Sequence, residues 1–223
     1  DCQYTATMNG TSSATPNVAG VVAMMLEANP KLSVRDLKYI LAATAKKVDS
    51  AFSGVSSTTI IPGSTVVLEQ GWVTNSAGWS FSNRYGFGAV DASAAVAMAK
   101  SYTAYLPAVQ QNSTFYPFLA APPAIIAPQS LTGMSAVITV AEPFNTVEFV
   151  VVFLNIASTP GLSCNQVELT SPSGTKSILM HAANGFKNAS VVNSRFLSNA
   201  FYGEPVNGNW TLTFFDFCTA RGI

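Results

Sequence analysis

The 223-residue chain contains little charge. Charged residues make up 10% of it, against roughly 25% in an average soluble domain, and 11 basic residues balance 11 acidic ones. A neutral chain without a basic cluster lacks the electrostatic signature of a nucleic-acid-binding or membrane-surface protein. Such sparse charge is more typical of an exported protein than of a cytoplasmic one. We therefore expect no nucleic-acid partner, no membrane partner, and a secreted or extracytoplasmic location.

The sequence also lacks a long apolar run. Spanning a bilayer takes about 18 apolar residues or more, whereas the run that starts at Val18 stops at Glu27, and "VEFVVVFLNI" contains Glu148. These lengths exclude a membrane-spanning helix and predict a soluble protein. The sequence starts at Asp1 without a signal peptide, so we expect it to be an internal piece of a longer protein.

Cysteine and histidine are scarce. Cys2, Cys164 and Cys218 are widely spaced, no CxxC pair occurs, and His181 is the single histidine. This set excludes a zinc site, and we predict no metal ligand in the chain. In an oxidising compartment Cys164 and Cys218 can pair. The alternative is three unpaired, buried thiols.

The first third of the chain predicts helices. Residues 12–29 have helical periodicity and are apolar on nearly every side, so we expect a helix that is buried all round. Pro30 ends it, and Ser33 followed by Asp36 is a capping-box-like start for a second, amphipathic helix. Asp91 is a good N-cap for a third helix. The apolar stripe of the second helix would comprise Val34, Leu37, Ile40 and Leu41.

Loops and strands make up the remainder. Residues 50–88 are rich in Ser, Gly, Thr and Trp and predict loops with short strands. Five prolines between 101 and 128 indicate a linker. Beyond it, segments such as "GNWTLTFFDF" alternate apolar and polar residues, the pattern of strands in a β-sandwich. The predicted domains are 1–105 and 129–223, separated by a Pro-rich linker at 106–128.

The stretch "MNGTSSATPNVAGVVAMM" at 8–25 places a serine at the start of the apolar helix. A serine is a nucleophile when its hydroxyl is exposed, a base accepts its proton, and donors stabilise the oxyanion. Gly10 permits unusual backbone geometry. Ser12 would lie in the first helical turn, where unpaired N–H groups and the helix dipole favour negative charge. The pattern favours Ser12 as a nucleophile; the alternative is that Thr11, Ser12 or Ser13 merely caps the helix.

The string "GTSSATP" at 10–16 resembles G-T-S-x-A-x-P, the nucleophile motif of subtilisin-like serine peptidases of the S8 family. "LEANPKLSVRDLKYIL" and "NRYGFGAVDASAAVAMA" are similar to later segments of the kexin and furin branch. "LTSPSGTKSIL" and "GEPVNGNWTLTFFD" are similar to the P (homo B) domain of that branch. The resemblance implies an α/β subtilisin-like catalytic domain, present only in its C-terminal part. An all-β jelly-roll-like P-domain sandwich, incomplete at its C-terminus, follows it.

By this resemblance Ser12 attacks the peptide carbonyl, its backbone N–H is an oxyanion donor, and the Thr11 hydroxyl assists. The full-length protein is then a serine endopeptidase whose triad Asp and His lie upstream of Asp1. The resemblance further implies a polypeptide substrate, the upstream part of its own catalytic domain and a propeptide as partners, and structural calcium held upstream. It implies no cofactor in this segment. His181 is interpreted as a strand residue outside the triad, so the chain alone is expected to be inactive.

Two other functions are alternatives to a serine peptidase. A non-catalytic binding or scaffold protein with a degenerate subtilisin fold would also explain why neither the triad Asp nor the triad His occurs here; the upstream sequence distinguishes the two. An esterase of the G-x-S-x-G class is excluded, because Ser12 is followed by Ser13 and Ala14.

Several other residues receive structural interpretations. Asp36, Asp49 and Asp91 form no calcium-loop pattern. Aromatic residues that favour packing over a ligand site are Trp72, Trp79, Tyr85 and Phe87. The sequons at Asn112, Asn188 and Asn209 would carry glycan only in a eukaryotic secretory route.

Overall fold

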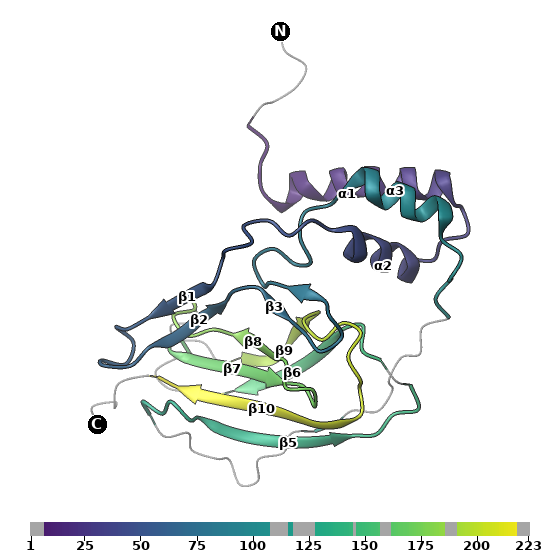
Figure 1. Cartoon of the computed structure of the whole chain (residues 1–223). Helices are drawn as coiled ribbons and strands as arrows, with labels where there is room; N and C mark the ends of the chain where they lie inside the picture. Colours follow the sequence, from purple (N-terminus) through teal and green to yellow (C-terminus); the bar gives the residue numbers. More distant parts are fainter. Residues whose placement is uncertain are drawn as a thin grey trace. The chain divides into compact units, whose positions relative to one another are not determined.

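Figure 1 shows the computed structural model of the chain. It describes residues 7–107, 116–117, 128–144, 146–156, 162–185 and 191–217, and only the backbone of 191–193. The chain forms two compact units. The first comprises residues 1–48 and 87–110, and the second comprises residues 49–86 and 111–223. The chain therefore enters the second unit, returns to the first, and then enters the second again.

Within the described residues, the first unit contains three helices whose starts follow local sequence signals. They are α1 (Thr11–Ala28), α2 (Val34–Thr44) and α3 (Ala92–Ser101). The Ser33 hydroxyl accepts from the Asp36 amide at 3.2 Å, and the Asp36 carboxylate accepts from the Ser33 amide at 2.8 Å. Asp91 caps α3 by accepting from the Ala94 amide at 3.0 Å. The three predicted helices, the capping box and the Asp91 cap are confirmed.

The core of the first unit covers only one face of α1. Val21 and Met25 are buried one turn apart, and Met25 is completely inaccessible. They join a core whose other buried members are Leu32, Ile40, Ala95, Ala99 and Tyr102. Met24 and Leu26, on other faces of α1, are 45% and 36% exposed. The prediction that this helix is buried all round is wrong for the described residues, because α3 and its neighbours cover a single stripe of it.

The predicted stripe of α2 holds over most of its length. Ile40 is fully buried, and Leu37 and Leu41 are half-buried against the same core. Val34 is 82% exposed, so its predicted place in the stripe is wrong. It is the first residue of α2, and the core begins only at the next turn.

The second unit is built from antiparallel strands. They are β1 (Gly54–Ser57), β2 (Val66–Gln70), β3 (Val73–Thr74), β4 (Ser80–Phe81), β5 (Met134–Val140), β6 (Val150–Ile156), β7 (Asn165–Thr170), β8 (Lys176–Met180), β9 (Val191–Ser198) and β10 (Gly208–Asp216). One sheet has the order β5–β10–β7–β8, and β6 pairs with β9. Leu212 of β10 lies opposite Ala136 and Leu169, its neighbours in β5 and β7.

Side chains from both of these sheets meet in one core. Val152 and Leu154 of β6 pack with Leu169 of β7 and with Trp210 and Leu212 of β10, and all five are buried. A core enclosed between two antiparallel sheets is the arrangement of a β-sandwich. The predicted fold class, a mixed α/β region followed by an all-β sandwich, is confirmed.

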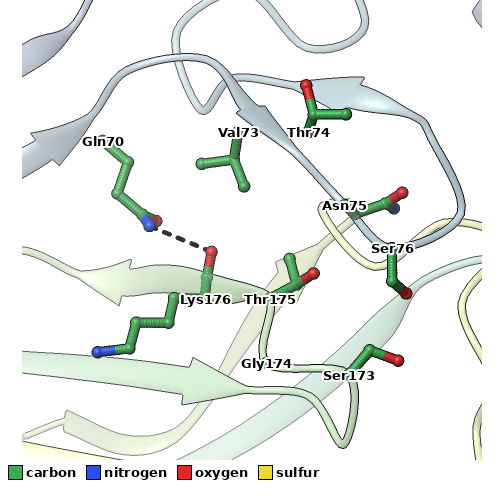
Figure 2. A pocket seen from close by; sticks show the side chains of 9 residues that line it. All are labelled: Gln70, Val73, Thr74, Asn75, Ser76, Ser173, Gly174, Thr175 and Lys176. Carbon is green, nitrogen blue, oxygen red and sulfur yellow. Dashed lines mark hydrogen bonds between the residues drawn. The ribbon is translucent and has the colours of Figure 1, made fainter.

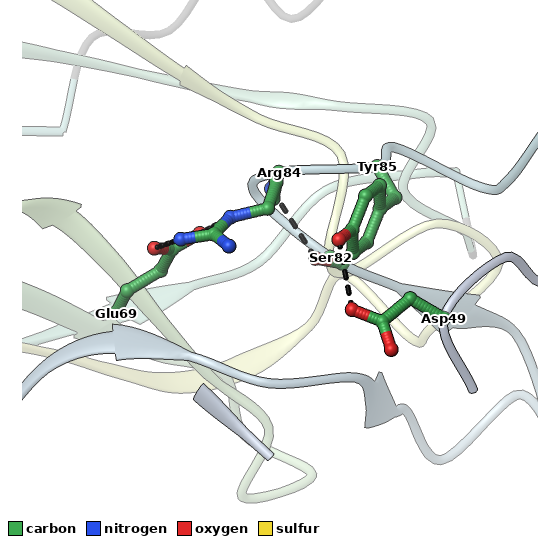
Figure 3. Close-up of polar contacts among 5 residues, drawn as sticks. All are labelled: Asp49, Glu69, Ser82, Arg84 and Tyr85. Atoms are coloured by element: carbon green, nitrogen blue, oxygen red, sulfur yellow. Dashed lines mark hydrogen bonds and ion pairs between the residues drawn. The ribbon is translucent and has the colours of Figure 1, made fainter. Parts of the chain in front are cut away.

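Polar contacts organise the loops around β1–β4 (Figure 3). The Arg84 guanidinium donates to both carboxylate oxygens of Glu69, from Nε at 2.9 Å and from Nη2 at 2.5 Å. The Tyr85 hydroxyl donates to Asp49 Oδ2 at 3.0 Å, and the Arg84 amide donates to the Ser82 hydroxyl at 3.2 Å. These are the loops and short strands that the composition predicts.

Some expectations concern residues outside the described part. Of the predicted linker at 106–128, only 106–107, 116–117 and 128 are described, so the domain boundaries 1–105 and 129–223 stay predictions. Cys164 is disulfide-bonded, which overturns the alternative of three unpaired thiols. The pairing of Cys164 with Cys218 stays a prediction, because Cys2 and Cys218 both lie outside the described residues. Among the helices described, none has the length and apolarity needed to cross a membrane.

Candidate active site

The candidate nucleophile lies where the chain turns into α1. Gly10 is the N-cap, and its φ of 82° falls in the left-handed region that favours glycine. The amides of Ser13 and Ala14 donate to the Gly10 carbonyl at 3.1 and 3.2 Å. The amides of Thr11 and Ser12 precede this first hydrogen-bonded turn, so the helix offers them no acceptor. Ser12 therefore lies at the positive end of the helix dipole, among N–H groups without helical partners.

The hydroxyl groups of this turn differ in their partners. Ser13 Oγ donates to the Gly10 carbonyl at 2.9 Å, and Thr15 Oγ1 donates to the Thr11 carbonyl at 2.8 Å. The Ser12 side chain is exposed, and its hydroxyl is not bonded to any other described residue. No side chain caps α1, so the alternative in which Thr11, Ser12 or Ser13 is the cap is wrong. The cap is Gly10, which has no side chain, and these three residues lie inside the helix.

Pro16 is the sixth residue of α1 and so lies beyond its first turn. A proline nitrogen carries no hydrogen, so the Ser12 carbonyl, four residues earlier, has no helical donor. Pro16 therefore costs α1 one backbone hydrogen bond. The Asn17 side chain donates to the next carbonyl, that of Ser13, at 2.9 Å.

An acid–base partner for Ser12 is not found among the described residues. His181 follows β8 in the second unit, is exposed, and has its Nδ1 2.6 Å from the Ala182 carbonyl. It lies just past the strand end rather than within the strand. In the described part of the chain, no group of three or more His, Cys, Asp or Glu side chains could hold a metal ion.

The aromatic residues singled out by the sequence pack against other rings. Trp72 stacks on Tyr85 with ring centroids 5.8 Å apart. Trp79 meets Tyr202 edge-on at 5.0 Å. These contacts agree with the packing interpretation. Of the three sequon asparagines, Asn209 is exposed on β10, and Asn112 and Asn188 lie outside the described residues.

A second feature, which the sequence did not indicate, lies beside the edge of β8. It is a pocket of about 390 Å³ walled by Gln70 and by residues 73–76 and 173–176 (Figure 2). The fully buried carboxylate of Glu204 is hydrogen-bonded to two residues of this wall, Ser76 and Thr175. Glu204 stands between a glycine and a proline without any periodic pattern, so no sequence signal reveals its burial.

Both parts of the chain are similar to known proteins. Residues 2–88 match the subtilase family, and residues 147–222 match the proprotein convertase P-domain. The chain is 37% identical over 232 residues to the Aeromonas extracellular serine protease of Aeromonas sobria, covering 95% of this chain and 36% of that protein. It is 34% identical over 208 residues to human proprotein convertase subtilisin/kexin type 6, covering 91% of this chain and 19% of that protein.

Solved structures agree with these matches. The serine protease of Aeromonas sobria is similar with a TM-score of 0.84 at 35% identity, covering 96% of this chain and 38% of that one. The same protease in complex with the chaperone ORF2 gives a TM-score of 0.83. The chain thus spans well under half the length of these proteases. It joins a segment that matches part of the subtilase family to a segment that matches the proprotein convertase P-domain, a combination shared with the proprotein convertases to which it is similar.

Proposed function

We propose that the full-length protein is a secreted serine endopeptidase and that Ser12 is its nucleophile. The observation that carries this proposal is the exposed, unengaged Ser12 hydroxyl at the positive end of α1, within the string "GTSSATP". Its relatives are named as serine proteases and convertases. The proposal therefore ranks above the alternative of a non-catalytic scaffold with a degenerate subtilisin fold.

The chemistry follows from the position of Ser12. Its Oγ attacks the carbonyl carbon of the scissile bond while a histidine from outside this chain accepts the proton. Negative charge moves to the carbonyl oxygen, where the Ser12 amide donates a hydrogen bond and the Thr11 hydroxyl assists. The histidine gives this proton to the leaving amine as the C–N bond breaks, and water, deprotonated by the same histidine, then hydrolyses the acyl-enzyme and restores the Ser12 hydroxyl. The substrate is a polypeptide.

The exposed apolar residues of α1 support the proposal that the catalytic domain is larger than the part of it in this chain. Met24 and Leu26 are exposed although the helix is apolar on nearly every side. Covering such surface stabilises a protein by about 25 cal/mol per Å² of apolar area removed from water. We propose that the upstream part of the same catalytic domain covers these faces and supplies the triad Asp and His. The chain by itself should then lack peptidase activity.

Secretion, calcium and a maturation partner belong to the same proposal. The disulfide at Cys164 is typical of an oxidising compartment. The Aeromonas sobria relative is named extracellular, and one solved structure holds it with a chaperone. We propose that a propeptide or a chaperone assists folding of the full-length protein. We also propose that structural calcium is held by residues upstream of this chain.

Replacing Ser12 by Ala in the full-length protein tests the nucleophile. The kcat/KM for a peptide substrate should fall by about 10⁶-fold, the scale found when subtilisin loses its triad serine. The Tm should not change, because the Ser12 hydroxyl makes no hydrogen bond within the described residues.

Ser13→Ala is the matched control. It removes a neighbouring hydroxyl whose one bond within the described residues is to the Gly10 carbonyl, and it should retain most of the activity. Wild-type turnover by Ser12→Ala would contradict the proposal. An inactive full-length protein whose upstream sequence lacks a triad histidine would support the scaffold alternative.

A further inference from the structure

The dipeptide Asn-Gly occurs three times in the chain, at 9–10, 184–185 and 207–208. Asparagine is thermolabile, and it deamidates most readily when glycine follows, because no side chain shields the glycine nitrogen from the asparagine amide carbon. An asparagine side chain that is held by hydrogen bonds cannot turn toward that nitrogen. The contacts of the three asparagines therefore decide which of these sequences can react in the folded chain.

Hydrogen bonds hold two of the three asparagines. Asn207 Oδ1 accepts from the Glu142 amide at 2.6 Å, and its Nδ2 donates to the Glu142 carbonyl at 3.0 Å. Asn184 Nδ2 donates to the carbonyls of Leu162 at 3.0 Å and His181 at 2.9 Å. Cyclisation at either asparagine would first have to break these bonds, so the fold protects both sites.

Asn9 and Gly10 lack this protection within the described residues. Both are exposed, and neither the Asn9 side chain nor the Gly10 amide has a hydrogen-bond partner in the described part of the chain. A Cβ built on Gly10 would meet nothing within 4 Å, so this peptide bond has room to rearrange. Gly10 is also the N-cap of α1, where the helix dipole stabilises the negative charge of an attacking amide nitrogen.

We propose that Asn9 is a site of spontaneous deamidation, and that this modification limits the working lifetime of the Ser12 site. The Gly10 nitrogen loses its proton and forms a bond to Asn9 Cγ. The Cγ–Nδ2 bond breaks, and the Nδ2 group takes up a proton and leaves as ammonia, so that a succinimide ring remains. Water then opens the ring at either carbonyl, which leaves aspartate or isoaspartate. The net reaction consumes water, releases ammonia and needs no oxidant.

The consequence for Ser12 rests on the proposed function. Isoaspartate adds a methylene to the main chain three residues before Ser12, and either product adds a carboxylate at the positive end of α1. The longer main chain displaces Gly10, from which the helix starts. The new charge also opposes the negative charge that develops on the substrate carbonyl oxygen. Both effects should lower kcat/KM.

Peptide mass spectrometry of the full-length Ser12→Ala protein tests the modification. This variant keeps Asn9 and Gly10 and lacks the proposed nucleophile, so self-digestion should not interfere. After incubation at mildly alkaline pH, the peptide that contains Asn9 should gain the mass of an NH₂-to-OH exchange and become a substrate for isoaspartyl methyltransferase. Asn184 and Asn207 should stay unmodified. In denaturant all three asparagines should react, which makes the two protected sites internal controls.

Activity of the full-length wild type tests the consequence. During the same incubation, kcat/KM per intact chain should fall in proportion to the fraction of chains modified at Asn9. Asn9→Gln should keep its activity, because a glutamine side chain forms the corresponding ring far more slowly. Asn207→Gln is the matched control and should lose activity as the wild type does.

Two results would overturn the proposal. The first is a folded protein in which Asn9 stays unmodified or reacts no faster than Asn184 and Asn207. The second is complete modification of Asn9 with unchanged kcat/KM per intact chain. A full-length protein that is modified at Asn9 but never shows peptidase activity would support the deamidation site and contradict the proposed function, so the two failures can be told apart.

Discussion

Asp36 shows how single residues set the stability of the first unit. Its carboxylate is buried and accepts from the Ser33 amide and hydroxyl at 2.8 and 2.7 Å, and from the Leu106 amide at 2.7 Å. Burial alone would raise the pKa of Asp36, but these hydrogen bonds outweigh it and hold the pKa below its ordinary value. The charged carboxylate is therefore the form that the fold stabilises.

Replacing Asp36 by Ala should lower the free energy of unfolding by about 2–4 kcal/mol, because it removes the Asp36 half of the capping box and leaves the Leu106 amide without its acceptor. A lowered pKa contributes stability above the unfolded-state pKa of about 3.9, and this stability is lost as the pH falls through the folded-state value. Denaturant unfolding should thus show a larger difference between wild type and variant at about pH 7 than at about pH 3. Equal differences at both pH values would refute this, and Glu27→Ala, an exposed acid on α1, serves as control.

Residues with local signals could be predicted, and residues with distant partners could not. The place of Ser12 in the first turn of α1 and the caps Ser33 and Asp91 could be predicted, because a helix start is encoded within a few neighbouring positions. The burial of Glu204 depends on Ser76 and Thr175, which are 128 and 29 positions away in the sequence. No periodic pattern in one sequence carries that information.

Among helices and strands, too, features with a local sequence signal were predicted correctly, whereas features that depend on distant residues were not. The apolar–polar alternation of β10 is a period-2 signal, and its partners β5 and β7 carry similar patterns. The strand β9 carries no such signal, because Asn193, Ser194 and Arg195 interrupt its apolar residues. The burial of α1 was overestimated, because an apolar helix surface predicts only that some segment should cover it. Within the described residues, this chain covers one face of α1 and leaves Met24 and Leu26 exposed.

The edge of the four-stranded sheet is closed by side-chain amides. β8 is the last strand of that sheet. Gln70 mimics a neighbouring strand, since its Oε1 accepts from the Ile178 amide at 2.9 Å and its Nε2 donates to the Lys176 carbonyl at 3.1 Å (Figure 2). Asn83 donates to the Ile178 carbonyl at 3.0 Å. Sealing an edge in this way prevents pairing with another chain.

Gln70→Ala should expose this edge. Because the Ile178 amide and the Lys176 carbonyl lose their partner, the free energy of unfolding should fall by about 1–3 kcal/mol. Concentration-dependent association should appear in analytical ultracentrifugation. Lys176→Ala is the control, since it removes an exposed side chain and keeps the carbonyl. A Gln70→Ala protein that stays monomeric and as stable as the control would show that the edge needs no such cover.

At the scale of the whole molecule, sequence families and compact units divide the chain differently. Residues 49–86 lie within the subtilase match, yet they fold with the second unit. Asn75 illustrates the connection, because its Nδ2 donates to the carbonyls of Ala200 and Tyr202, both at 2.9 Å. A linker composition at 106–128 predicts a boundary between domains, but it cannot show that an earlier segment packs with a later one. That association depends on contacts more than a hundred residues apart.

We propose above that Ser12 is the nucleophile of a serine peptidase that residues outside this chain complete. The most direct measurement is reaction of the full-length protein with a fluorophosphonate, followed by peptide mass spectrometry. We expect one stoichiometric adduct on Ser12, none on Ser13, and none on the isolated 223-residue chain. A folded full-length protein that carries the triad Asp and His but reacts at another residue, or does not react, would contradict it.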